Sequence, residues 1–295
     1  MNGAPVVVGT DGSEPAGAAL ALAAGEAAAH GRRLVIAHAV DRTPPPGPAA
    51  MLHESGQPAL RERGESILRE ARTRAEDLAP GIAVETALST DDARSLLAEL
   101  GAEAFLTVVG SRGHGRVASG LLGSVTRHLT AVARTPVLVA RSSRPPTGPV
   151  VLGVDGSPAA EAATAFAFQE AAVHETDLLA LHAWTEWSVP TLPHTDPTRS
   201  IAEVVEELRD GEERLLAEAL AGWAERCPEV SVERRSVNGR IRQTLLDAAA
   251  GAGLLVVGSR GRGGFPGLRL GSVSSAMLQH APCPVAVVPG TDREP

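Results

Sequence analysis

The strongest constraint on the fold of this chain is an internal repeat, because the 295-residue sequence contains the same landmarks twice. They recur in the same order, and they are VVVGTDGS (6–13) and VVLGVDGS (150–157), AHAV (37–40) and LHAW (181–184), and the VVGSRG that begins at residues 108 and 256. Between residues 104–126 and 252–274, 13 of 23 positions are identical. Self-similarity of this kind indicates a tandem duplication of one structural unit.

The length is compatible with two hydrophobic cores, since 295 residues suffice for two domains of ordinary size. The stretch RSSRPPTGP, rich in Pro, Gly and Ser, lies between the copies and is typical of a linker. We predict a first domain over residues 1–141, a linker over 142–148 and a second domain over 149–295.

Each copy alternates short apolar runs with helical segments. The predicted strands cover residues 5–9, 33–40, 82–88, 104–109 and 136–140, and then 149–154, 177–183, 230–236, 253–257 and 284–288. In the first copy an Ala-rich helix follows the first strand, and further helices are predicted at 59–79, 92–101 and 123–133. Strands that alternate with helices pair in parallel through right-handed crossovers. The predicted fold class is therefore α/β, with two tandem doubly wound five-stranded parallel sheets.

The composition excludes several classes of function. All 27 basic residues are Arg, so no lysine is available for a Walker-type phosphate loop, a Schiff base or a general base. The chain has no Tyr, 2% aromatic residues and a formal net charge of −8, which argues against a nucleic-acid partner. Cys227 and Cys283 have no C-x-x-C spacing, so we predict neither a disulfide scaffold nor a zinc module.

No apolar stretch approaches the roughly 18 residues that a membrane span requires. The N-terminus, MNGAPVVVGTDGS, has neither a basic segment nor a sustained apolar segment of the kind found in secretory signals. We expect no membrane association and a cytoplasmic location.

The third landmark is a glycine-rich loop in which G-x-x-G is followed, after nine residues, by Gly-Ser at the start of a helix. Glycines let backbone N–H groups approach an anion, and a helix N-terminus offers further N–H groups at its positive end. We expect unpaired N–H groups at Gly123, Ser124 and Val125, with hydroxyl donors at Ser124 and Thr126. The predicted phosphate cradles consist of Gly110, Gly113, Gly123, Ser124, Val125 and Thr126, and of Gly258, Gly261, Gly271, Ser272, Val273 and Ser274. A structural turn without a ligand is the alternative for the GSRG residues.

Charged side chains accompany these loops. Asp11 and Asp155 follow the first strand of each copy, where each either caps the next helix or serves a ribose hydroxyl or a metal ion near phosphates. Four loop arginines either neutralise a triphosphate or are solvent-exposed charges, and they are Arg112, Arg116, Arg260 and Arg262. His38 and His182 close the second strand of each copy, and we interpret both as hydrogen-bonded structural groups. His114 corresponds to Arg262 in the second copy, so no chemistry shared by the two copies is assigned to it.

The two G-x-x-G signatures resemble those of the universal stress proteins. The resemblance extends over essentially the whole chain, since it includes the VVVGTDGS run, the histidine-ended second strand and the final TPVLVAR and CPVAVVP runs. It implies the strand order 3-2-1-4-5 and an ATP site in each domain, with Mg as a companion ion. It also implies pairing of the last strands of the domains and a homodimer.

The resemblance assigns roles by position. Asp11 and Asp155 would hold ribose or metal, and the backbone of Ala39 and Ala183 would meet adenine. The residues before the aspartates complete the predicted sites, and they are Gly9, Thr10, Gly153 and Val154. The copies differ beside the adenine position, where Val40 of the first is replaced by Trp184 in the second.

The leading functional hypothesis is a regulatory ATP-binding protein of the stress response, in which nucleotide stabilises a conformation or oligomer that a protein partner recognises. No catalytic residues are predicted, because the sequence has no nucleophile elbow, H-E-x-x-H motif or Walker lysine. A slow ATPase or phosphotransferase is the first alternative. An interaction module without nucleotide is the second.

Overall fold

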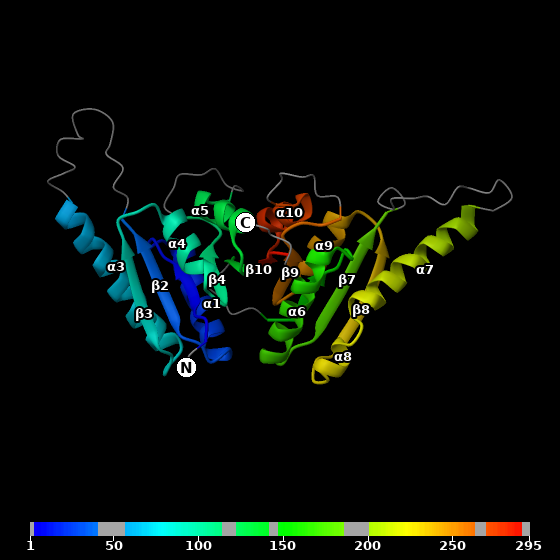
Figure 1. Cartoon of the computed structure of the whole chain (residues 1–295), viewed down its shortest axis with the longest axis horizontal. Helices are drawn as coiled ribbons and strands as arrows, with labels where there is room; N and C mark the ends of the chain where they lie inside the picture. Colours follow the sequence, from blue (N-terminus) through cyan, green and yellow to red (C-terminus); the bar gives the residue numbers. More distant parts are fainter. Residues whose placement is uncertain are drawn as a thin grey trace, which may run out of the picture. The chain divides into compact units, whose positions relative to one another are not determined.

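The computed structural model describes residues 3–40, 57–113, 122–141, 147–185, 201–262 and 270–290. The chain divides into two compact units, Met1–Pro145 and Pro146–Pro295, and Figure 1 colours the first from blue to green and the second from green to red. The linker boundaries at 142–148 stay a prediction, since residues 142–146 lie outside the described ranges.

The first unit contains a parallel five-stranded sheet. Its strands are β1 (Val6–Gly9), β2 (Leu34–Ala39), β3 (Val84–Ser89), β4 (Leu106–Gly110) and β5 (Val137–Ala140). Its described helices are α1 (Glu14–Ala29), α3 (Gln57–Leu78), α4 (Ala93–Ala102) and α5 (Ser124–Val132). The strand order is β3-β2-β1-β4-β5, and every neighbouring pair is parallel. Helix α1 contacts α3, and α4 contacts α5, as all four pack against the strands.

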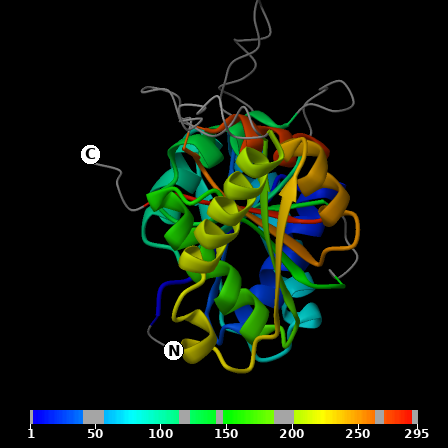
Figure 2. The same ribbon diagram turned by 90° about the vertical axis from the view of Figure 1, so that its right-hand side faces the viewer.

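The second unit has the same plan. Its strands are β6 (Val150–Gly153), β7 (Leu178–Trp184), β8 (Val232–Asn238), β9 (Leu254–Gly258) and β10 (Val285–Val288), in the order β8-β7-β6-β9-β10. Its described helices are α6 (Pro158–Val173), α7 (Ile201–Ala219), α8 (Trp223–Arg226), α9 (Ile241–Ala249) and α10 (Ser272–His280). Figure 2 shows α7 alongside β8, and α7 contacts both β7 and β8.

The strands are apolar runs because both faces of each sheet are covered. Val6, Val7 and Val8 are fully buried although their side chains point alternately to opposite faces. Helix α1 begins where the sequence indicates, with Ser13 as its N-cap, accepting a hydrogen bond from the Ala16 N–H, and a proline in its first turn.

The sequence-based expectations for the fold are confirmed. Each predicted strand and helix lies within two residues of the observed element, and the strand order 3-2-1-4-5 holds in both units. The short helix α8 was not predicted, and its Trp223 ring stacks on the buried Phe168 ring of α6, with 5.1 Å between centroids. No helix in the described ranges is long and apolar enough to cross a membrane.

Two leucine-to-alanine substitutions test this core. Leu278 of α10 is fully buried, so Leu278→Ala should lower the free energy of unfolding of the second unit by about 2–5 kcal/mol. Leu78, at the end of α3, is 51% exposed, so Leu78→Ala should change stability by less than about 0.5 kcal/mol. Urea unfolding followed by circular dichroism measures both, and equal effects would contradict the assigned burial.

Candidate functional site

The repeated landmarks meet at the carboxyl edge of each sheet. In the first unit β1 lies between β2 and β4. The strand order reverses at β1, because β2 and β3 lie on one side of it and β4 and β5 on the other. The arrowheads of the strands within a unit point to one edge in Figure 1. Open parallel sheets bind ligands at such a switch point, and here the aspartate turn follows β1 while the glycine loop follows β4.

The aspartate turn of the first unit is a local hydrogen-bonded structure. The Asp11 Oδ1 atom accepts the Ser13 N–H at 3.0 Å, and Gly12 has a left-handed backbone with φ of +80°. Ser13, not Asp11, is the N-cap of α1. The Asp11 carboxylate therefore does not cap α1 and instead closes a local turn before the helix.

The second unit repeats this turn and connects it to the glycine loop. Asp155 Oδ1 accepts the Ser157 N–H at 3.0 Å and the Ser157 hydroxyl at 2.7 Å, while Gly156 has a φ of +66°. Its other oxygen, Oδ2, accepts the backbone N–H of Arg262 at 3.1 Å. The carboxylate thus joins two segments that are 107 residues apart in the sequence.

The second glycine of each loop lies against an aspartate carboxylate. A Cβ atom placed on Gly113 would be 2.5 Å from the Asp11 Oδ2 atom, and one placed on Gly261 would overlap with Asp155 in the same way. The first glycine, Gly110, is required by packing, because a Cβ there would be 2.8 Å from the Pro15 carbonyl oxygen. Contact with the backbone thus explains Gly110 whether or not an anion binds, whereas Gly113 and Gly261 meet the end of a side chain that can move.

The helix that follows each loop begins without a side-chain cap. No side chain caps the N-terminus of α5 or of α10. The expected unpaired N–H is wrong at Gly123, which donates to the Ser111 carbonyl at 3.0 Å, and at Gly271, which donates to the Ser259 carbonyl at 2.7 Å. These bonds close the loop on the strand end, so the anion-binding potential is left to the next N–H groups of the helix.

The hydroxyls in the first helical turn also have a structural task. Thr126 donates to the Gly110 carbonyl at 2.7 Å, and Ser274 donates to the Gly258 carbonyl at 2.6 Å. Both side chains are buried, so the expectation that the Thr126 hydroxyl is a spare donor is wrong. Ser124 and Ser272 are exposed at the first helical position, where a ligand would reach them.

The arginines of the loops are not equivalent. Arg112 and Arg262 are exposed, whereas Arg260 is half-buried. The Arg262 guanidinium lies close to Gly156, because a Cβ there would be 2.6 Å from its Nη2 atom. Residues His114 and Arg116 lie outside the described ranges.

Both second strands end in a histidine bonded to the strand beside it. His38 Nδ1 is 2.8 Å from the Thr10 carbonyl oxygen, and His182 Nδ1 is 2.7 Å from the Val154 carbonyl oxygen. These bonds agree with the structural interpretation of the two histidines. In the second unit Glu212 of α7 also contacts His182, and no pattern in the sequence predicts this contact.

The residues expected beside adenine lie at the same strand ends. Ala39 is half-buried and Ala183 is buried, and each precedes a buried side chain, Val40 or Trp184. The Trp184 indole N–H donates to the Ser236 hydroxyl at 3.1 Å. Its ring packs with two apolar side chains of α7, Val204 and Leu208.

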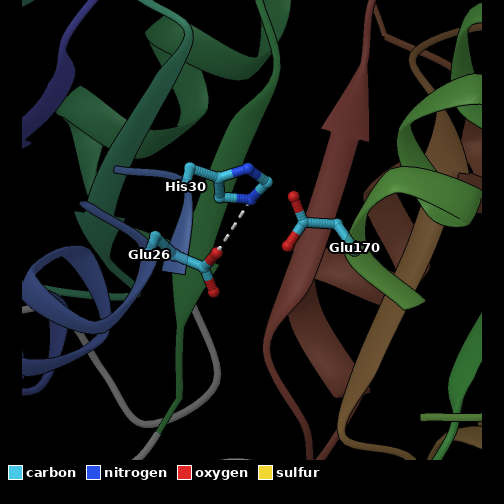
Figure 3. Close-up of side chains that lie close together, drawn as sticks. All are labelled: Glu26, His30 and Glu170. Carbon is cyan, nitrogen blue, oxygen red and sulfur yellow. Dashed lines mark ion pairs between the residues drawn. The ribbon is translucent and has the colours of Figure 1, made fainter. Parts of the chain in front are cut away.

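Other clusters of chemically reactive side chains lie elsewhere. Glu26 and His30, at the end of α1, form a pair with 3.6 Å between Oε2 and Nε2, drawn in Figure 3. This pair precedes β2 and so belongs to the amino edge of the strands. Cys227 and Cys283 are not joined in a disulfide. Burial, followed by the nearby Glu229 carboxylate, raises the Cys227 pKa, against a smaller lowering by Arg226.

Comparison with known proteins agrees with a tandem α/β protein. The family model described as the universal stress protein family matches residues 4–141 and again 147–289. A universal stress protein of Mycolicibacterium smegmatis is 37% identical over 290 residues, covering 96% of each chain. One of Mycobacterium tuberculosis is 38% identical over 290 residues, with the same coverage. The chain belongs to the universal stress protein family.

The fold is also found among solved structures. A universal stress protein from Archaeoglobus fulgidus superposes with a TM-score of 0.69 at 19% sequence identity, over 98% of this chain and 99% of that chain. At this identity the likeness concerns the fold alone.

Two glycine-to-alanine substitutions in the second unit should change its stability in opposite directions. Gly156→Ala should destabilise the second unit by about 1–2 kcal/mol, because an alanine at φ of +66° is strained and its Cβ meets Leu215 and Arg262. Gly211→Ala, in the interior of α7 with open space around its Cα, should stabilise the unit by about 0.5–1 kcal/mol. Chemical denaturation measures both, and a neutral Gly156→Ala would contradict the turn.

Proposed function

We propose that each domain binds one ATP at the carboxyl edge of its sheet and that the protein is an ATP-binding regulator of the stress response. The observation that carries the proposal is a constellation present twice. In each unit an aspartate turn, a glycine held against its carboxylate and a helix start without a side-chain cap follow neighbouring strands.

The helix starts supply the phosphate contacts. The N–H groups of Ser124 and Val125, and of Ser272 and Val273, belong to the first helical turn, which has no intrahelical acceptors for them. These groups carry the positive end of the helix dipole, which favours phosphate. Arg112 and Arg260 lie beside these helix starts, since a Cβ atom on Gly123 or Gly271 would be 3.5 Å from their Cα atoms. Arginine pairs with phosphate in a bidentate manner.

The aspartates suit the ribose or the accompanying magnesium ion. A carboxylate offers about four lone-pair positions, and three of those on Asp155 are used by Ser157 and Arg262. One acceptor position remains for a ribose hydroxyl or for a water of a hydrated Mg²⁺ ion. Asp11 holds the corresponding place in the first domain, and the adenine would meet the backbone of Ala39 or Ala183.

The available chemistry favours binding over turnover. Every basic side chain other than histidine is arginine, which stays protonated and cannot act as a base. The two strand-end histidines are engaged with backbone carbonyls. We propose that hydrolysis is very slow or undetectable and that nucleotide acts through the conformation or oligomeric state. A homodimer through the last strands, a regulatory protein partner and a cytoplasmic location are parts of this proposal.

The phosphate cradles can be tested by charge reversal at the helix starts. The double variant Ser124→Asp plus Ser272→Asp should weaken ATP binding at least about tenfold, because a carboxylate would then face the phosphates. An acidic residue at this position interacts favourably with the helix dipole, so the fold should be retained. Calorimetric titration of purified protein should give up to two ATP per chain for the parent and reduced affinity for the variant.

Two controls accompany this titration. Ser124→Ala plus Ser272→Ala removes the hydroxyls without adding charge and should weaken binding much less. Nucleotide released from freshly denatured protein should be ATP, and phosphate release followed for hours should not exceed that of the charge-reversed variant. Unchanged ATP affinity in the charge-reversed protein would refute the site, and faster release by the parent would favour a slow ATPase.

A second variant tests the contact between glycine and aspartate. Gly113→Ala plus Gly261→Ala should also weaken ATP binding, because each methyl group would displace the carboxylate of Asp11 or Asp155. A matched control is Gly25→Ala, on a part of α1 where a Cβ meets no atom within 4 Å. ATP affinity that falls in the control as much as in the double variant would count against this explanation.

A further inference from the structure

The second unit contains a buried histidine that is bonded on both sides. On one side His182 Nδ1 lies 2.7 Å from the carbonyl oxygen of Val154, and on the other His182 Nε2 lies 2.5 Å from Glu212 Oε2. His182 is 4% exposed and Glu212 is 8% exposed. We call these three groups, the Val154 carbonyl, the His182 ring and the Glu212 carboxylate, the bracket.

The donors and acceptors of the bracket can be assigned from its chemistry. A backbone carbonyl oxygen only accepts, so His182 Nδ1 carries a hydrogen and donates it to Val154. The contact between His182 Nε2 and Glu212 then requires one hydrogen between the two atoms. Both ring nitrogens are therefore engaged, and the orientation of the ring is fixed from α7.

The bracket ends on the peptide group that precedes Asp155. The Val154 carbonyl carbon is bonded to the Asp155 nitrogen, so holding this carbonyl fixes the plane from which the Asp155 side chain departs. Asp155 in turn holds Ser157 and the Arg262 N–H of the glycine loop. A continuous set of contacts thus runs from α7 to both halves of the candidate site.

Helix α7 also contacts the aspartate turn directly. A Cβ atom placed on Gly156 would be 2.9 Å from Leu215 Cδ2, and Leu215 lies on α7 one turn beyond Glu212. The turn after β6 is therefore packed against α7 through Leu215 and bonded to it through the bracket. A change in the position of α7 would therefore move Asp155 through the packing of Leu215 and through the bracket.

The first unit has the histidine but not the carboxylate. His38 Nδ1 contacts the Thr10 carbonyl at 2.8 Å, as in the second unit. On its other side α3 presents Gly64, where a Cβ atom would be 3.1 Å from His38 Cδ2 and 3.0 Å from Val40 Cγ2. Within the ranges that the structure describes, no hydrogen bond or ion pair engages His38 Nε2.

We propose that Glu212 and His182 are positioning residues for the second nucleotide site, coupling its occupancy to the docking of α7 through hydrogen bonds. In the described part of the chain the first site lacks this hydrogen-bonded coupling, although Ile67 of α3 packs near Gly12 as Leu215 packs near Gly156. The inference rests on the proposed ATP binding. When Glu212 is removed, the His182 ring loses one of its two anchors and holds the Val154 carbonyl less firmly, so the binding-competent fraction of the second site falls. Apparent affinity falls in proportion to that fraction.

The test uses the full chain with one site closed at a time. Ser124→Asp closes the first cradle and leaves the second for measurement, and Ser272→Asp does the reverse. In the Ser124→Asp background, Glu212→Ala should weaken ATP binding about tenfold, which corresponds to a competent fraction of about one tenth. In the Ser272→Asp background the same substitution should leave ATP affinity at the first site unchanged.

Conservative and matched variants separate positioning from general destabilisation. Glu212→Gln should restore ATP affinity to within about twofold, because its amide N–H can donate to His182 Nε2. Glu213→Ala removes an exposed carboxylate from the same helix and should have no effect. Equal losses in Glu212→Ala and Glu212→Gln, or a loss at the first site, would overturn the proposal.

Amide hydrogen exchange without nucleotide provides a readout that does not depend on ATP binding. The N–H groups of Ser157 and Arg262, which donate to Asp155, should exchange several-fold faster in Glu212→Ala than in the parent or in Glu212→Gln. Unchanged exchange would overturn the bracket itself. Faster exchange with unchanged ATP affinity would overturn its role in binding. No ATP binding in either background would overturn the proposed function, while exchange would still decide whether α7 holds the turn.

Discussion

The candidate sites depend on one hydrogen bond, which joins the first turn of a helix to the last carbonyl of a strand. Thr126 donates to Gly110 in the first unit, and Ser274 donates to Gly258 in the second. Such a bond contributes about 0.5–1.5 kcal/mol, but its main effect is geometric. The strand is fixed in a buried sheet, so the helix start is held at the carboxyl edge, beside the turn that carries the aspartate. The N–H groups proposed to bind phosphate and the carboxylate are thereby brought to one place.

The fold could be predicted from the sequence because its signals are local or repeated. Apolar runs mark strands buried on both faces, and the Asp-Gly-Ser turns and glycine loops mark the carboxyl edge. The partners of individual polar groups could not be predicted. The Gly123 N–H is used by Ser111, and His182 is held by a glutamate 30 residues away. Such pairings depend on how a helix is rotated about its axis over the sheet. The periodicity of its apolar residues shows which face packs on the sheet but not which single polar residue meets a given partner. The short helix α8 likewise depends on a distant contact, that of Trp223 with Phe168.

The two units place the candidate site at the same strand ends but differ in the helix that packs on the strand-end histidine. In the first unit the helix over the histidine presents Gly64, and the ring is packed against apolar atoms. In the second unit the helix presents Glu212, and Trp184 fills the neighbouring space with Val204 and Leu208. The surroundings of a site can therefore change while the residues that would contact a ligand stay the same. A duplicated chain with this property can carry one tightly supported site and one that is more loosely supported.

The left-handed turn glycines also limit how these loops can evolve. Gly12 and Gly156 have φ values of +80° and +66°, a region in which asparagine and aspartate are the best tolerated replacements. In the genetic code no glycine codon reaches an asparagine codon by a single base change. Single changes lead to alanine, valine, serine, cysteine, arginine, tryptophan, glutamate or aspartate. Aspartate is thus the one accessible neighbour suited to the backbone, and at Gly12 it would add a negative charge beside the carboxylate of Asp11. The turn at Gly12 is held at glycine by backbone geometry, codon structure and local charge together. At Gly156 the Arg262 guanidinium offsets the charge, and close contact with Leu215 opposes a side chain instead.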